Sequence, residues 1–233
     1  MGSLWQAQRY IHDRLCDFAE GNSCRGLRVG PDAVIIYCMS DSKAILLAAA
    51  AEQFAKYGPK GTRVQDIVQA AGINERMIYH HFGSKAGLYA AVMREQRALL
   101  GAAWWPALEK AVTMDPYPGM QLALGGFFDA LLARPQVASL LLHEGLGDSP
   151  LALPEGVTGL PGPVRSLYER GQAEGVFAAE VPFEIAYATA VSCLVAMTVF
   201  APRFADLGET GFDTDQPRFR DQVIGQLLNG MTG

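Results

Sequence analysis

The 233-residue sequence lacks several features that define other classes of protein. Its four cysteines form no CxxC pair and no zinc-type spacing, which argues against a structural zinc site. Its longest apolar run, residues 186–201, is shorter than the roughly 20 residues of a typical membrane span. Charged residues interrupt any apolar core of a signal peptide near the N-terminus. We therefore expect a cytoplasmic protein with no metal, no cofactor and no membrane partner.

The first 38 residues do not share the pattern of the rest. They hold three of the four cysteines and a weak apolar run at 33–38, with no clear amphipathic helix beyond Trp5–Phe18. Met39 is followed by SDSKAILLAAA, which resembles a natural protein start. We interpret residues 1–38 as a leader, either an over-extended gene start or a disordered segment. A mass spectrum of the endogenous protein tests this interpretation, because a peptide covering Leu4–Arg14 would contradict the later start.

The net charge of −5 is mildly acidic, but the charges are unevenly distributed. Residues 40–100 carry eight basic and five acidic side chains, a net +3, whereas residues 101–233 carry seven basic and fifteen acidic ones, a net −8. A basic segment on an otherwise acidic chain is the asymmetry expected of a localised polyanion-binding module.

No run alternates apolar and polar residues for long enough to predict a strand, and helical patterns fill the chain. Residues 42–58 form a strong helix with Ser42 as its cap, stopped by Gly58 and Pro59. Further helices are predicted at 62–72, 75–82, 84–105, 119–133, 135–145, 163–175, 182–201 and 216–230. The fold class is therefore all-α. We expect an N-terminal three-helix helix-turn-helix domain at 39–100 and a C-terminal helical ligand-binding and dimerisation domain at 101–233.

Cap residues define three of these helices closely. Thr62 and Gln65 have the spacing of a capping box, and Gly72 ends the helix that follows. Asn74 is placed to cap the next helix and Ser84 the long one after it. Pro106 is expected to end that long helix.

The short helix ERMIYHHF poses the main functional question, since it holds two adjacent histidines. At 100° per residue, Ile78 and Phe82 form its core side, whereas Arg76, Met77 and His80 lie opposite. His80 and His81 point roughly 100° apart, and no HExxH motif or acidic partner accompanies them. A metal or catalytic site is therefore not expected, and the histidines are predicted to be surface groups.

A short exposed helix held across a tight glycine turn from its predecessor is typical of a helix-turn-helix, whose second helix enters the major groove. Arg76 and His80 can donate to guanine or phosphate, and Met77 can pack on a thymine methyl. Tyr79 and His81 can hydrogen-bond the DNA backbone. The helix starts at Thr62 and Ser84, with Arg63 and Lys85 beside them, are natural phosphate sites. The alternative is an ordinary bundle surface with solvated polar residues. The local positive charge and the closely spaced capped helices favour DNA.

The stretch from Lys43 to about Leu99, which includes YHHFGSK, resembles the DNA-binding domain of the tetracycline-repressor (TetR) family. The resemblance covers about a quarter of the chain. It implies that Thr62, Tyr79 and Lys85 hold phosphates and that Glu75, Arg76 and Met77 face bases. It also implies a homodimer on a pseudo-palindromic operator of double-stranded DNA.

Two residues depart from the family pattern. Glu75 stands where a neutral or basic residue is more common, and Arg76 stands where a small residue is common. Glu75 can accept from a cytosine amino group, or it can simply favour the helix N-terminus. Gly87 lies in the first turn of the long helix, at an expected cost of about 1 kcal/mol relative to alanine. We infer an unusual operator sequence.

The second half of the chain carries the predicted dimer and effector surfaces. The predicted dimer surface combines the segments 164–175 and 183–201. The second segment is apolar nearly all round, so a core-facing side and a partner-facing side are both expected, although complete burial in one chain stays an alternative. Small residues that permit close helix contact are Ala186, Ala188, Ala190, Ser192 and Ala196. Candidate lining residues of an effector pocket are Trp104, Trp105, Phe127, Phe128, His143, Tyr168 and Tyr187. The scarcity of basic residues there favours a neutral or cationic apolar effector.

These observations predict a ligand-responsive DNA-binding repressor, with no catalytic residues. Alternatives are a transcriptional activator, a regulator without a ligand, and an all-helical small-molecule-binding protein or enzyme. The last class requires converging polar groups after residue 100, where His143 and Glu144 form an isolated pair.

Overall fold

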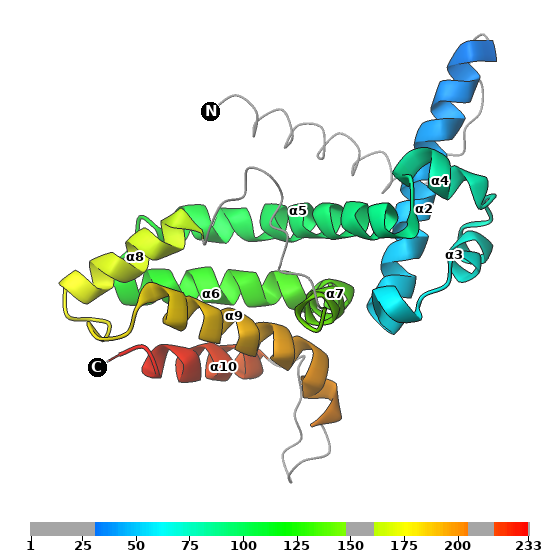
Figure 1. The fold of residues 1–233 in the computed structure, drawn as a ribbon. Coiled ribbons are helices and arrows are strands. Elements are labelled where there is room, and N and C mark those ends of the chain that lie inside the picture. The colour runs from blue at the N-terminus through cyan, green and yellow to red at the C-terminus, as the bar shows by residue number, and fades with distance from the viewer. Residues whose placement is uncertain (1–30, 148–160, 205–216, 233) are drawn as a thin grey trace. The chain divides into compact units, whose positions relative to one another are not determined.

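The computed structural model describes residues 31–147, 161–204 and 217–232, which form helices and the turns that join them (Figure 1). The elements are α2 (Pro31–Gly61), α3 (Val64–Ala71), α4 (Arg76–Phe82), α5 (Lys85–Ala111), α6 (Pro116–Leu132), α7 (Pro135–Gly145), α8 (Gly162–Ala173), α9 (Phe183–Phe200), the 3₁₀ helix η1 (Ala201–Arg203) and α10 (Pro217–Asn229). The predicted all-α class is confirmed for these residues.

The contacts divide the chain into two units between residues 43 and 44, and this division falls within the bounds of α2. Most of the predicted leader, residues 1–30, lies outside the described residues. The helix starts at Pro31, a favoured first position, and no breaker follows before Ser42. The prediction that Ser42 caps a helix is therefore wrong, because it lies inside α2. The domain boundary near residue 100 stays a prediction.

One hydrophobic cluster holds α2, α3, α4 and the start of α5 together. Its fully buried members include Leu46 and Phe54 of α2, Ile67 of α3, Ile78 of α4 and Leu88 of α5. The apolar positions predicted for α3 and α4 therefore face one shared core. This packing leaves the opposite sides of α3 and α4 in solvent.

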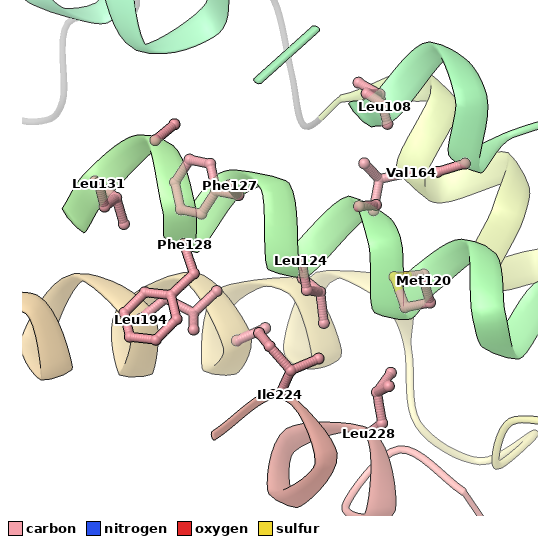
Figure 2. Packing of buried hydrophobic residues seen from close by; sticks show 14 of the residues in the cluster. Leu108, Met120, Leu124, Phe127, Phe128, Leu131, Val164, Leu194, Ile224 and Leu228 are labelled. Carbon is pink, nitrogen blue, oxygen red and sulfur yellow. The ribbon is translucent and has the colours of Figure 1, made fainter. Parts of the chain in front are cut away.

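A second cluster surrounds α6, which contacts α5, α8, α9 and α10. Figure 2 shows side chains leaving α6 in two directions, with Phe127 on one side and Phe128 near Leu194 of α9 on the other. Ile224 and Leu228 of α10 point toward α6 from below. The core of the second half is thus built on both sides of one helix.

The long helix α5 continues through Pro106 to Ala111, so the prediction that Pro106 ends it is wrong. A proline inside a helix leaves the carbonyl four residues earlier without its N–H partner. Both Pro106 and Ala102 are exposed, so water can reach the unpaired carbonyl of Ala102. The proline is tolerated because it lies on the solvent side of α5.

The apolar helix α9 is long and apolar enough to cross a membrane by length and composition alone, with a mean hydropathy of 1.7 over 18 residues. One side of it packs in the second cluster through Phe183, Ala186, Ala190 and Leu194. The burial of this side among α6 and α7 accounts for part of its apolar composition. Ile185 and Phe200 remain exposed on other sides.

Helix α7 lies against elements of both clusters. Its Leu140 is buried in the first cluster, and its Leu141 packs against both. His143 lies close to Gly58, since a Cβ atom added at Gly58 would lie 2.9 Å from Nδ1 of His143. Glu144 forms an ion pair with Arg97 of α5. The end of α7 is therefore anchored to the α2–α3 turn and to α5.

Candidate nucleic-acid interface

The start of α3 is set by Gly58 and Thr62. Gly58 has φ 68° and ψ 172°, a region that only glycine occupies readily, and it breaks the helical geometry inside α2, so the regular helix stops there as predicted and a separate turn follows up to Gly61. Thr62 is buried, and its hydroxyl lies within donating distance of two carbonyls, that of Gly58 at 2.7 Å and that of Gln53 at 3.0 Å, which share its one proton. The predicted capping box is wrong, because the threonine hydroxyl is used to secure the turn and α3 has no side-chain cap.

The turn between α3 and α4 follows the predicted chemistry. Gly72 adopts a left-handed conformation with φ 64°, and the N–H of Ile73 donates to Val68 at 3.2 Å. The side chain of Asn74 accepts from the N–H of Arg76 at 2.9 Å, which confirms its capping role. These bonds hold α4 at a defined angle to α3.

Helix α4 presents a polar side to solvent. Ile78 is fully buried and Phe82 packs on the same cluster, as predicted, whereas Arg76, Tyr79 and His80 are exposed. Met77 is half-buried and packs against the cluster, so less of it is available to a thymine methyl than the helical wheel suggested.

Glu75 and Tyr79 form a pair that the sequence pattern did not predict. The Tyr79 hydroxyl donates to Glu75 Oε1 at 3.2 Å, and this bond raises the pKa of Tyr79 above its ordinary value. The spacing of four residues on a helix was the available signal, since such side chains are neighbours.

The turn into α5 depends on Ser84 and Gly87. Ser84 is the predicted cap, and its hydroxyl accepts from the N–H of Gly87 at 3.0 Å. A Cβ atom on Gly87 would lie 2.0 Å from the carbonyl oxygen of Phe82. The expectation that Gly87 costs stability relative to alanine is therefore wrong, because alanine does not fit this turn.

The remaining predicted DNA-contacting residues surround α4. Arg63 is exposed at the start of α3, and Lys85 is half-buried as the first residue of α5. His81 is half-buried, with its ring 5.1 Å from that of His80 and 5.9 Å from that of Phe82. Thr62 differs from the others because its hydroxyl and its N–H both donate within the protein.

A small cavity lies between α6, α8 and α9, with a volume of about 10 Å³, which is room for one water molecule. Tyr168 and Tyr187 line it, together with apolar side chains that include Met120, Leu124 and Phe183. Burial raises the pKa of Tyr187 to about 12. The lining contains no charged side chain.

The other predicted pocket residues lie away from this cavity. Trp104 donates to the carbonyl of Ala123 at 2.8 Å and packs on Phe127, while Trp105 is exposed. Phe128 packs on Phe219 of α10, and His143 lies at the α2–α3 turn.

An open depression of about 560 Å³ lies between α2 and α3. Its lining includes Gln53, Tyr57 and Gln69, and it combines Arg63 with Asp66. The opposite charges cancel, so this depression favours neither an anion nor a cation.

Comparison with known proteins identifies the same region. Residues 46–92 match the family model described as bacterial regulatory proteins, tetR family. The chain is 30% identical over 147 residues to the HTH-type transcriptional repressor NicS of Pseudomonas putida, covering 61% of this chain and 68% of NicS. It is 28% identical over 137 residues to the HTH-type transcriptional regulator RutR of Escherichia coli K12, covering 58% of this chain and 60% of RutR.

Solved structures extend the likeness to most of the chain. A TetR family transcription regulator from Marinobacter aquaeolei has a TM-score of 0.64 at 18% identity, covering 82% of this chain and 96% of its own. A TetR-family regulator from Haemophilus influenzae has a TM-score of 0.62 at 14% identity, covering 84% of this chain and 99% of its own. At such low sequence identities, the TM-scores show a shared fold. Together with the match to NicS and the capped helix-turn-helix, they establish that the chain belongs to the TetR family of helix-turn-helix transcriptional regulators.

Proposed function

We propose that this protein is a cytoplasmic repressor that binds a pseudo-palindromic operator as a homodimer and is released by a small neutral apolar effector. The observation that carries the proposal is the exposed polar side of α4, with Arg76, Tyr79 and His80 in solvent above a buried Ile78. A helix stabilised on one side and polar on the other is suited to the major groove.

The charged groups near α4 supply both kinds of contact that DNA recognition needs. Arg76 and His80 can donate to base edges, and Arg76 is the better candidate because arginine bonds guanine with two donors. Arg63 and Lys85 lie at the N-terminal ends of α3 and α5, where positive charge and free N–H groups favour phosphate. Thr62 supports the turn in this proposal and is not assigned to a phosphate.

The dimer surface is assigned to the solvent side of α9, with α8 beside it. Ile185 is 59% exposed, and Ala188, Ser192 and Phe200 continue the exposed side along the helix. Ala186 and Ala190, which the sequence also suggested, are buried inside the chain. Large apolar groups left in solvent beside small ones favour close packing against a second copy.

The effector is assigned to the cavity that Tyr168 and Tyr187 line. Its walls offer two phenol groups and apolar carbon, and a charged ligand there would lose its hydration without a partner charge. We therefore assign a neutral apolar effector, in place of the cationic one that the charge balance also allowed. At about 10 Å³ the cavity must open to admit it, so binding requires a different packing of α6, α8 and α9.

Release follows from that repacking. The long helix α5 runs from the operator-binding region into the second cluster, and α7 contacts the α2–α3 turn through His143. An effector that prefers the opened packing shifts the population and moves the two α4 helices away from operator spacing. Effector binding that left the affinity for the operator unchanged would contradict this mechanism.

The test is a titration of the purified protein with duplex DNA from beside its own gene, at several salt concentrations, with a scrambled duplex as control. We expect tight binding to the native duplex with one dimer per site. Weak, equal binding that vanishes with salt would place the operator elsewhere, and no binding at any salt would contradict the proposal. Reporter output that rises with the protein instead of falling would indicate an activator.

Two substitutions separate base reading from phosphate binding. Arg76→Ala should relax specificity at one base pair by about 1–3 kcal/mol, whereas Lys85→Ala should weaken binding to all duplexes equally and reduce the salt slope. Affinity measurements on single-base operator variants distinguish these results. Equal losses on every sequence for both variants would refute the assignment of Arg76 to a base.

A further inference from the structure

The pair formed by Glu75 and Tyr79 lies on the side of α4 that we assign to DNA. Tyr79 is 51% exposed, and its hydroxyl donates to Glu75 Oε1 at 3.2 Å across one helical turn. The side chain of Asn74 caps the first turn, so the Glu75 carboxylate is not needed for that role. The pair therefore presents a negative charge and a phenol at the same point of the surface.

A phenol has one proton, so Tyr79 can donate to one acceptor at a time. Phosphate oxygens are acceptors, and Tyr79 cannot donate to one of them while it donates to Glu75. If Tyr79 turns to a phosphate, the carboxylate loses its donor while it lies beside a polyanion. Such an unpaired charge is unfavourable unless another donor replaces the phenol.

In the major groove, such donors are the N4 amino group of cytosine and the N6 amino group of adenine. Guanine and thymine present only acceptors and a methyl group on that edge, and they would repel the carboxylate or leave it unpaired. We propose that Glu75 and Tyr79 act as one specificity unit. Tyr79 donates to a phosphate only when the amino group of cytosine or adenine replaces its hydroxyl as the donor to the Glu75 carboxylate. This inference rests on the proposed function.

The unit differs from an ordinary pair of DNA contacts. A phosphate contact normally adds the same affinity on every sequence, because it carries no sequence information. Here the affinity that Tyr79 adds depends on the base that faces Glu75. The effects of changing Tyr79 and of changing that base should therefore be non-additive, and the non-additivity should disappear when Glu75 is removed.

The first experiment locates the base pair. The full-length protein and its Glu75→Ala variant each select duplexes from a random library at one salt concentration. We expect the variant to lose the preference for cytosine or adenine at one position in each half-site and to keep the others. Tyr79 is exposed and Glu75 is half-buried, and thermal unfolding of each variant checks that the fold is preserved.

The second experiment is a cycle on two duplexes, the selected one and one with that base pair inverted, such as C·G to G·C. Tyr79→Phe should weaken binding to the selected duplex by about tenfold or more, in keeping with a lost hydrogen bond to a charged group, and should change binding to the inverted duplex less than about twofold. In the Glu75→Ala background, Tyr79→Phe should cost the same on both. Lys85→Ala is the matched control, because its loss should be equal on both duplexes in either background.

Equal losses for Tyr79→Phe on the two duplexes would overturn the inference, as would a Glu75→Ala variant that selects the same sequences as the parent protein. In both cases the parent would still select a specific duplex, and the proposed function would stand. A parent that selects no duplex above a scrambled one would overturn the proposed function together with the inference.

Discussion

At the scale of single residues, glycines at the turns of the DNA-binding region have opposite roles from glycines elsewhere. A Cβ atom on Gly87 would lie 2.0 Å from a backbone oxygen of the preceding turn, whereas one on Gly101 of the same helix meets nothing within 4 Å. The same residue type is therefore required at one position of α5 and costs stability at another.

Gly87→Ala should destabilise the protein by about 1–3 kcal/mol, because the α4–α5 turn must shift to accommodate the methyl group. Gly101→Ala is the matched control and should stabilise by up to about 1 kcal/mol, since alanine favours an exposed helix interior. Urea unfolding of both variants measures these changes. A Gly87→Ala variant as stable as the parent would show that the turn has room for the methyl group beside the carbonyl of Phe82.

Tyr187 gives the cavity a signature in alkaline solution. Burial raises its pKa to about 12 from an ordinary value near 10, so the neutral phenol is favoured in the folded state. The free energy of unfolding therefore keeps its full value below about pH 10. It falls by about 2–3 kcal/mol as the pH rises toward about 12, because the unfolded state ionises first. Tyr187→Phe should lose less stability than the parent between pH 9 and pH 11 in chemical unfolding. An identical loss in both proteins would contradict the burial of this phenol.

At the scale of elements, the α2–α3 turn is held by backbone geometry and by contact with α7. Gly58→Ala should destabilise by about 1–3 kcal/mol, because alanine strains at φ 68° and its Cβ would lie 2.9 Å from His143 Nδ1. Adding His143→Ala should recover only part of the loss, since it removes the contact and leaves the strain. Gly61→Ala is the matched control, because its Cβ would make an ordinary 3.4 Å contact.

Thermal unfolding of the parent and these three variants separates the two causes. Complete recovery by His143→Ala would show that the contact alone matters, and a Gly58→Ala variant as stable as Gly61→Ala would contradict the turn geometry.

The helices could be predicted from sequence wherever a local signal determines their ends. Gly72, Asn74 and Ser84 act through neighbours within five residues, so their roles were accessible from spacing alone. Thr62 could not be predicted, because its hydroxyl bonds to carbonyls of the preceding helix and not to α3. Pro106 was misjudged because its tolerance depends on which side of α5 meets solvent.

In the candidate interface too, features that depend on one helix could be predicted, and features that depend on contacts between side chains or helices could not. A helical wheel placed Ile78 inside and Arg76 outside, since both depend on the period of one helix. It treated positions singly, and it therefore missed the bond between Tyr79 and Glu75. The residues around the cavity depend on how α6, α8 and α9 pack, which no local pattern specifies. For that reason aromatic composition alone did not separate Tyr168 and Tyr187 from core residues such as Phe128.

At the scale of the whole molecule, the proposed function links operator binding to self-association by geometry. One α4 helix reads only a few base pairs, and a second copy at a fixed distance makes the two weak contacts act together. The exposed side of α9 lies in the second half of the chain, far along the sequence from α4. A substitution there can therefore test the dimer without altering any residue assigned to DNA.

Ile185→Glu should convert the proposed dimer into a monomer, because it places a charge without a partner in the proposed apolar contact. Sedimentation velocity should report the monomer, and operator affinity should fall to that of a single half-site. Leu146→Glu is the matched control, since Leu146 is 80% exposed at the end of α7 and the same change there should leave both properties intact. If the Ile185→Glu protein remained a dimer, the interface would lie on a surface other than the exposed side of α9. A monomer that still bound the full operator as tightly as the parent would break the link between association and recognition.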